Sequence, residues 1–143
     1  MSGINMKKKV LFICTHNSAR SQMAEGLLRS LYGDRYKIYS AGTYPSQVNP
    51  NATRVMAEIG IDISSHHAKS VKEFLGEEID YMVTVCDGAH LVCPFFPGGK
   101  EYMHKSFDDP SLFEGEPQDI LNRFRRVRNE ITGWIKQTFG KRD

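Results

Sequence analysis

Cysteine is scarce in this chain: there are three, at positions 14, 86 and 93. An odd number of cysteines disfavours a framework of static disulfides. In a reducing compartment, cysteines serve metal or redox chemistry more often than structural bridges. The scarcity therefore directs attention to the chemistry of each one.

Long apolar runs and a strong net charge are also missing. No stretch approaches the ~20 apolar residues that span a bilayer, and the first residues lack the apolar region of a signal peptide. The net charge of +2 is too small to favour nucleic acid as a partner. We therefore expect a cytoplasmic monomer without membrane or nucleic-acid partners. Its length suits one domain over residues 1–143, in which residues 1–7 can be disordered.

The apolar pattern alternates between strands and helices. It predicts strands at residues 8–13, 37–40 and 81–85, and a short fourth strand near Lys105. It predicts helices from Gln22 to about Gly33, from Pro50 to Gly60 with Ile59 on the apolar face, at 70–75, and from Pro117 onward. This order predicts an α/β fold, a four-stranded parallel sheet with helices on both faces.

The most informative segment runs from Cys14 to Ser21, between a buried strand and a helix start. Such a loop presents backbone N–H groups to a tetrahedral oxyanion, at the positive end of the helix dipole. The same field is expected to favour the thiolate of Cys14, which is the nucleophilic form. Arg20 offers a planar fork of donors to two oxyanion oxygens. The residues predicted to bind the oxyanion are Thr15, His16, Asn17, Ser18, Ala19, Arg20 and Ser21.

A bare C-x5-R pattern does not decide the function by itself. It also fits a buried cysteine at a strand end followed by a solvated arginine. The preceding strand, the Asn17-Ser18 pair, Ser21 and the helix beyond favour the catalytic interpretation. In parallel sheets, ligands bind beyond the carboxyl ends of the strands. Cys86 also follows a predicted strand, so Cys14 and Cys86 are expected to face one crevice.

The segment VLFICTHNSARSQMAEG, residues 10–26, resembles the signature of thioredoxin-coupled arsenate reductases, which share the fold of low-molecular-weight protein tyrosine phosphatases. The similarity extends through Y39-S-A-G, N49-P-N-A, G60-I-D-I-S, V83-T-V-C, C93-P and F107-D-D-P, and so covers most of the chain. The joint presence of these motifs is far more specific than any one of them.

The resemblance implies a three-cysteine relay. Cys14 attacks arsenic, a Cys14–Cys86 disulfide displaces arsenite, and a Cys86–Cys93 disulfide carries the oxidation outward to thioredoxin or a similar dithiol reductant. Cys86 and Cys93 could instead belong to a metal site, or they could be two unrelated buried cysteines. We predict no metal site and no cofactor, because C-x6-C is not a usual zinc spacing.

A moving part is expected between Cys86 and Cys93. If the segment is helical, seven residues separate the two Cα atoms by ~10 Å. A disulfide needs a Cα separation of roughly 4.4–6.8 Å. The helix must therefore unwind to form the Cys86–Cys93 disulfide.

The resemblance places a general acid on Asp109, in Asp108-Asp109-Pro110, where a positioned proton would help the leaving oxygen depart. Asp-Pro is also common in turns, and Asp109 can serve both the turn and the reaction.

Some members of the resembled family bind potassium beside the loop, through residues that align with Asn17, Glu25 and Ser40 and through an aspartate whose position falls on Lys69. The Lys69 ammonium is expected to replace the ion, pair with Glu25 and brace Asn17; the alternative is an ordinary solvated lysine.

The remaining predictions concern two loop positions that differ from relatives and the exposure of histidine and arginine side chains. His16 and Ala19 depart from relatives, many of which have glycine and a further cysteine at these positions. His66 and His67 are expected at the surface. A solvated helix face is expected for the arginine run at 123, 125, 126 and 128.

The predicted function is therefore reduction of arsenate to arsenite by a thioredoxin-dependent enzyme. The alternative enzyme is a low-molecular-weight protein tyrosine phosphatase, because the anion-binding loop is shared. A non-enzymatic oxyanion or redox sensor is the third possibility, and the chain has no second-domain segment to support it.

Overall fold

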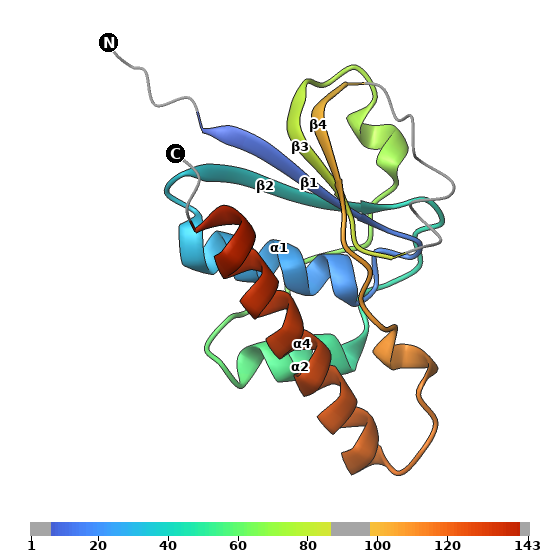
Figure 1. The fold of residues 1–143 in the computed structure, drawn as a ribbon. Helices are drawn as coiled ribbons and strands as arrows, with labels where there is room; N and C mark the ends of the chain where they lie inside the picture. The colour runs from blue at the N-terminus through green and yellow to red at the C-terminus, as the bar shows by residue number, and fades with distance from the viewer. Residues whose placement is uncertain (1–6, 87–97, 141–143) are drawn as a thin grey trace.

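The computed structural model describes residues 7–86 and 98–140. Its centre is a four-stranded parallel sheet in the order β2-β1-β3-β4 (Figure 1). The strands are β1 Lys8–Cys14, β2 Tyr36–Gly42, β3 Ile79–Thr84 and β4 Gly99–His104. The predicted class of fold is confirmed. The predicted unwinding segment and Cys93 lie in residues 87–97, outside the described residues.

Within residues 7–86 and 98–140, three α-helices lie together on one face of the sheet (Figure 1). They are α1 Arg20–Tyr32, α2 Pro50–Ala57 and α4 Pro117–Phe139, and two short 3-10 helices are η1 Val71–Phe74 and η2 Pro110–Leu112. The η1 helix covers the opposite face, where Phe74 packs on the Tyr39 ring at 5.3 Å between centroids. In the described part of the chain, no helix is long and apolar enough to cross a bilayer.

The core is anchored at the end of α4. The Phe139 ring makes edge-to-face contacts with Phe12, Tyr36 and Tyr81 from three neighbouring strands, and with Trp134 one turn earlier. Edge-to-face pairs add to the stabilisation that burial alone gives. The long helix is thereby fixed across the sheet, and the opposite, carboxyl edge of the strands is left for the loops that form the site.

Two expectations about the burial of side chains are wrong. Ile59 does not lie on a buried helical face: α2 ends at Ala57, and Ile59 is 45% exposed in the turn that closes at Gly60. Arg128 is buried rather than solvated. Its guanidinium donates to the Val55 carbonyl oxygen at 2.8 Å and so ties α4 to α2.

Glu58 predicts a specific acid sensitivity. Hydrogen bonds from Arg125, followed by those from Arg128, lower the pKa of Glu58 from 4.5 to about 2. A carboxylate with a depressed pKa stabilises the fold above pH 4.5, and this contribution is lost as the pH falls toward 2. We expect the melting temperature of the Glu58→Gln variant to fall less steeply than that of the wild type over this range. Parallel melting curves across the range would contradict this assignment.

Candidate active site

The two strand-end cysteines meet at the carboxyl edge of the sheet. Parallel pairing places Ile13 beside Thr84, so Cys14 and Cys86 follow neighbouring strands at nearly the same level. Both side chains are buried, at 3% and 2% exposure, and their sulfurs share a hydrogen bond. The two cysteines meet as predicted, although of the two only Cys14 lines the cavity described below.

The protonation state expected for Cys14 is wrong in this structure. The hydrogen bond with Cys86, followed by burial, raises the pKa of the Cys14 thiol well above its ordinary value. The Arg20 charge and the Thr15 N–H act in the opposite direction and are outweighed. The neighbouring sulfur and the lack of water therefore favour the thiol of Cys14 over the free thiolate.

Thr15 has a contact that the sequence did not indicate. Its hydroxyl oxygen lies 3.3 Å from the Cys86 sulfur, although the two residues are 71 positions apart. A hydroxyl at this distance can donate to a thiolate and stabilise it. The prediction that Thr15 binds the oxyanion concerns the backbone of the loop; the Thr15 side chain faces the second cysteine.

The loop after β1 is turned with its carbonyl groups outward. The segment between β2 and α2 donates backbone N–H groups to the carbonyl oxygens of Cys14, Thr15, His16 and Ser18, at 2.7 to 3.2 Å. Helix α1 then begins at Arg20 without a side-chain cap. Because its carbonyl groups are held outside, the loop is shaped to present N–H groups and a helix N-terminus to an anion.

The close approach of this outer segment requires a glycine at position 42. A Cβ atom there would lie 2.7 Å from the Thr15 carbonyl oxygen and 2.9 Å from the Asn17 nitrogen, both backbone atoms. We expect Gly42→Ala to lower the free energy of unfolding by about 1–3 kcal/mol, as overpacking typically does, and to weaken oxyanion binding.

A matched control is available at Gly133 within α4, where nothing lies within 4 Å of an added Cβ. Gly133→Ala is expected to be stabilising by up to about 1 kcal/mol, because alanine favours helix. Denaturant unfolding and anion titration measure both variants. Equal unfolding free energies for the two would contradict the role assigned to Gly42.

Asn17 is the internal brace of the loop. It is fully buried, and among the described residues it is the one non-glycine with positive φ, at 51°. Its amide nitrogen donates to the hydroxyls of Ser21 and Ser40 at 2.8 and 2.9 Å. Ser21 accepts here, so its own proton is free to point elsewhere. The loop conformation thus depends on a completely paired side chain.

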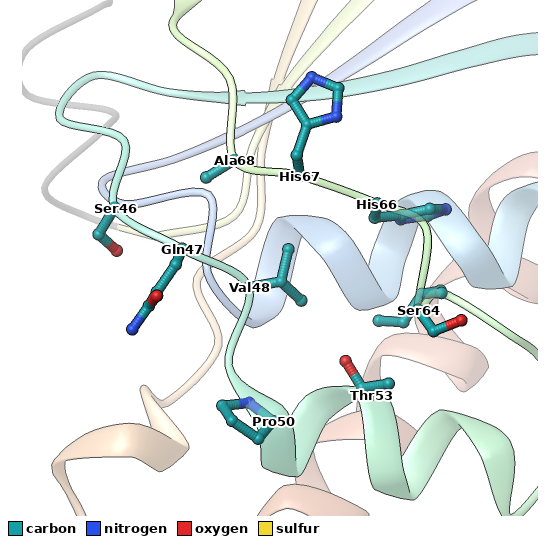
Figure 2. A pocket seen from close by; sticks show the side chains of 10 residues that line it. Ser46, Gln47, Val48, Pro50, Thr53, Ser64, His66, His67 and Ala68 are labelled. Carbon is teal, nitrogen blue, oxygen red and sulfur yellow. The ribbon is translucent and has the colours of Figure 1, made fainter.

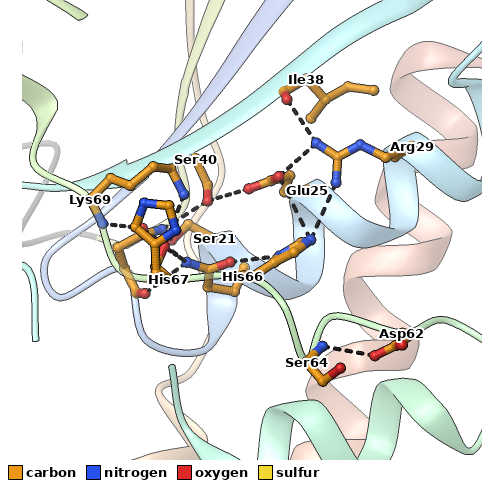
Figure 3. Close-up of polar contacts among 12 residues, drawn as sticks. Ser21, Glu25, Arg29, Ile38, Ser40, Asp62, Ser64, His66, His67 and Lys69 are labelled. Carbon is orange, nitrogen blue, oxygen red and sulfur yellow. Dashed lines mark hydrogen bonds and ion pairs between the residues drawn. The ribbon is translucent and has the colours of Figure 1, made fainter. Parts of the chain in front are cut away.

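The role expected for the Lys69 ammonium is wrong. The backbone N–H of Lys69 donates to the Asn17 side chain at 2.9 Å, while its ammonium donates to the His67 carbonyl oxygen. Glu25 pairs instead with Arg29, at 2.6 Å (Figure 3). Lys69 therefore braces Asn17 through its backbone N–H, a group that every residue except proline has.

Arg20 and Asp109 face one another across the site. One Arg20 nitrogen lies 3.2 Å from the Asp109 carboxylate, and the other donates to the Phe107 carbonyl oxygen at 3.0 Å. The second carboxylate oxygen of Asp109 accepts from the N–H and hydroxyl of Ser111, so Asp109 caps η2. The Asp-Pro turn is thus present, and it holds Asp109 at the site.

A small cavity of about 190 Å³ collects these groups. It is lined by Cys14, His16, Ser18, Ala19, Arg20, Ser46, Asn49, Asp109 and Ser111. None of these described residues is a phenylalanine, tyrosine or tryptophan, and most are polar. A cavity of this size and lining suits a small polar anion better than an aromatic ring.

A second cavity of about 540 Å³ lies beside the first and shares Ser46 with it. Figure 2 shows segment 46–50 and α2 on one side and segment 64–68 on the other. His66 forms part of its wall, and its side chain is 13% exposed. The expectation that His66 is a surface residue is therefore wrong, whereas His67 is exposed as predicted.

Comparison with known proteins agrees with this geometry. The model of the family described as low molecular weight phosphotyrosine protein phosphatase matches residues 9–141. The chain belongs to this family. The arsenate reductase of Halalkalibacterium halodurans is 47% identical over 130 residues, which cover 91% of this chain and 94% of that protein.

Solved structures of arsenate reductases share the fold of this chain. The crystal structure of arsenate reductase from Archaeoglobus fulgidus has a TM-score of 0.76 at 30% identity, covering 92% of this chain and 99% of that one. A thioredoxin-dependent arsenate reductase of Corynebacterium glutamicum has a TM-score of 0.62 at 30% identity, covering 92% of this chain and 63% of that one. The resemblance stated from the sequence is confirmed.

The predicted site residues of this family member divide into three groups. Cys14, Cys86, Arg20 and Asp109 come together at the small cavity, with Cys86 behind Cys14. Asn17, Ser21 and the Thr15 hydroxyl lie behind the cavity rather than on its wall. Cys93 is outside the described residues. Among the described residues, no three metal-binding side chains gather at one point.

Proposed function

We propose that this chain reduces arsenate to arsenite, with Cys14, Cys86 and Cys93 acting in sequence. The observation that carries the proposal is the contact between the Cys14 and Cys86 sulfurs beside an anion-binding loop. Hydrolysis of a phosphate ester needs one cysteine, whereas reduction of arsenate needs two electrons from a pair of thiols. Relatives named arsenate reductase support this choice.

The first step joins Cys14 to arsenic. Arsenate binds in the loop against N–H groups and the Arg20 fork, which replaces its hydration shell with fixed donors. The Cys14 proton passes to the arsenate dianion as the sulfur attacks, so the raised pKa of the thiol does not block the reaction. A sulfur–arsenic bond forms, an arsenic–oxygen bond breaks, and Asp109 protonates the departing oxygen, which leaves as water.

The second step reduces the arsenic. The Cys86 sulfur, assisted by the Thr15 hydroxyl at 3.3 Å, attacks the Cys14 sulfur and forms a disulfide. The electron pair of the sulfur–arsenic bond stays on arsenic, which changes from arsenic(V) to arsenic(III), and the departing arsenite takes up the Cys86 proton. The two cysteines together lose the two electrons that arsenic gains.

The third step moves the oxidation outward. Cys93 attacks Cys86, forms a Cys86–Cys93 disulfide and frees Cys14 as a thiolate. A dithiol protein such as thioredoxin then reduces that disulfide. The Corynebacterium glutamicum neighbour named thioredoxin-dependent supports this reductant. A relay that returns to free thiols suits the cytosol, where thiols stay reduced.

A phosphatase acting on phosphotyrosine is the second candidate, because the family model is described by that activity. The lining of the small cavity weighs against it, since the described wall is mostly polar and has no phenylalanine, tyrosine or tryptophan to stack on a tyrosine ring. Weak hydrolysis of aryl phosphates is still expected, because the anion-binding loop serves both reactions.

The test couples reduced protein to thioredoxin, thioredoxin reductase and NADPH. We expect NADPH consumption when arsenate is added and none when phosphate replaces it. Without thioredoxin, each chain should release one arsenite and stop, because its thiols supply one electron pair. Hydrolysis of para-nitrophenyl phosphate without any arsenate-dependent NADPH consumption would identify a phosphatase instead.

A further inference from the structure

Six side chains behind the anion-binding loop form a closed ring of hydrogen bonds (Figure 3). They are Arg29, Glu25, Ser40, Asn17, Gln22 and His66. The ring joins helix α1, strand β2, segment 66–69 and the loop itself. All but Arg29 are buried or half-buried, so their polar groups rely on one another rather than on water.

The direction of each hydrogen bond in the ring is fixed by its atoms. Gln22 donates from its amide nitrogen to the Asn17 side-chain oxygen at 2.9 Å, so its own oxygen must accept. That oxygen lies 2.9 Å from His66 Nδ1, which makes Nδ1 the protonated nitrogen of the imidazole. His66 Nε2 then accepts from Arg29 at 3.3 Å. The geometry therefore assigns neutral His66 with its proton on Nδ1.

The hydrogen bonds of the ring all donate in one direction, from Arg29 toward Glu25. Arg29 donates to Glu25 directly at 2.6 Å. It also donates to His66, and a chain of bonds through Gln22 and Asn17 ends where Ser40 donates to Glu25 at 2.6 Å. The Arg29 guanidinium is thus linked to the Glu25 carboxylate in two ways, by a direct hydrogen bond and by a chain of hydrogen bonds that all donate in the same direction. Such chains strengthen cooperatively, and breaking one bond weakens the rest.

Protonation of His66 breaks one bond of the ring. A second N–H, on Nε2, would displace the hydrogen bond that Arg29 donates to this nitrogen at 3.3 Å, and it would face the Glu25 carboxylate 3.9 Å away. Burial, with Arg29 and Lys69, lowers the pKa of His66, while Glu25 and Asp62 act to raise it. Neutral His66 is favoured at neutral pH, and its stabilising contribution is lost as the pH falls below the ordinary value of 6.5.

The anion-binding loop depends on the ring through Asn17. The left-handed backbone of Asn17 is unfavourable for a residue with a side chain, and the surrounding bonds must hold it. Gln22 also donates to the Asn17 carbonyl oxygen at 3.2 Å and to the His67 carbonyl oxygen at 3.1 Å. Gln22 therefore fixes both the side chain and the backbone of Asn17, and His66 fixes Gln22.

We propose that Gln22 and His66 are positioning residues for the oxyanion site, and that acid weakens oxyanion binding by protonating His66. His66 forms part of the wall of the second cavity, so protons can reach it without passing through the anion site. The proposal deepens the proposed function, because it assigns a pH response to the same loop. It requires only that the loop bind a tetrahedral anion.

The test uses sulfate as the anion, because sulfate remains a dianion between about pH 5.5 and pH 7.5, where histidine titrates. Isothermal titration compares wild type, His66→Asn and the matched control His67→Asn. Asparagine retains a donor near the Nδ1 position and does not titrate. We expect the ratio of wild-type to His66→Asn sulfate affinity to fall about tenfold from about pH 7.5 to about pH 5.5, a usual size for coupled sites. The His67→Asn variant should behave like the wild type. If the ratio of wild-type to His66→Asn affinity is the same at both pH values, the proposal is overturned.

A second measurement needs no variant. Nitrogen NMR of the wild-type imidazole at neutral pH should show the proton on Nδ1 of His66, and the Asn17 and Gln22 side-chain amides should shift together as His66 protonates. A proton on Nε2 at neutral pH overturns the proposal. Gln22→Met should weaken sulfate binding at neutral pH and remove the difference between wild type and His66→Asn.

Failure of this proposal and failure of the proposed function are distinguishable. Sulfate binding and NMR require no turnover, so the ring can be tested in a protein that never reduces arsenate. A constant affinity ratio together with normal arsenite release would reject the ring alone. The predicted pH response without arsenite release would reject the arsenate reductase function alone.

Discussion

Replacing Cys86 with serine is expected to lower arsenate reduction by at least about 1,000-fold, as loss of a covalent catalyst commonly does, while para-nitrophenyl phosphate hydrolysis stays within a few fold of the wild type. A serine hydroxyl cannot form a disulfide with Cys14, so the arsenic adduct has no route to arsenite. Hydrolysis is proposed to use Cys14, Arg20 and water, all of which remain. Arsenite release and nitrophenol release are measured on the same preparation.

The titration of the Cys14 thiol distinguishes a reactive Cys86 from an ordinary core cysteine. The hydrogen bond between Cys14 and Cys86 is the largest cause that raises the pKa of Cys14. Cys86→Ala removes that bond, so the thiolate of Cys14 should form at lower pH, visible by its ultraviolet absorbance. An unchanged Cys14 titration together with unchanged arsenate turnover would place Cys86 outside the reaction.

Cys93→Ser is the companion variant. It should release one arsenite per chain and then stop, even with thioredoxin present, because the Cys14–Cys86 disulfide is left between two buried side chains. Continued turnover with thioredoxin would show that the buried disulfide is reduced directly and that the third cysteine is not needed.

The strand-end position of the cysteines could be predicted because it depends on a local pattern and on one general property of parallel sheets. Residues 10–13 are continuously apolar, and the carboxyl ends of parallel strands share an edge. Cys14 and Cys86 follow from these two facts without any knowledge of the loops. The Asp-Pro turn could be predicted for the same reason, since turn chemistry is local.

The properties set by contacts between distant segments could not be predicted in this way. His66 lies in a polar stretch, and only the fold brings it to Gln22, 44 residues earlier. The backbone of Lys69, rather than its charge, meets Asn17, 52 residues earlier. Arg20 and the Thr15 N–H lower the pKa of Cys14 as the loop alone predicts, but burial and the sulfur of Cys86, which comes from a distant segment, outweigh them.

Arg20 has two protein partners in addition to the anion it is proposed to bind. It is tied to the Phe107 carbonyl oxygen and to the Asp109 carboxylate, and it lines the same small cavity as Cys14. Only a planar fork with several donors can hold both partners and still face an oxyanion. The guanidinium therefore joins the anion-binding loop to the segment that carries the proposed acid.

Arg20→Lys is consequently expected to lower both arsenate reduction and para-nitrophenyl phosphate hydrolysis by about 100-fold or more, equivalent to about 2.7 kcal/mol, the usual loss for one oxyanion donor. A lysine keeps the charge but offers a point donor, which cannot contact Phe107, Asp109 and the anion together. Because Arg20 serves the step that both reactions share, the two activities should fall by the same factor. This separates Arg20 from Cys86, whose loss should affect reduction alone.

Arg125→Lys on the exposed face of α4 is the matched control, because Arg125 pairs with Glu58 far from the cavity and its replacement should leave both activities unchanged. If Arg20→Lys retained either activity at the wild-type rate while both variants stayed folded, the guanidinium would have no part in binding the anion. If Arg20→Lys lost reduction but kept hydrolysis, its effect would have to act through Asp109 and the departing oxygen of arsenate. Equal loss of both activities is the outcome that the shared loop requires.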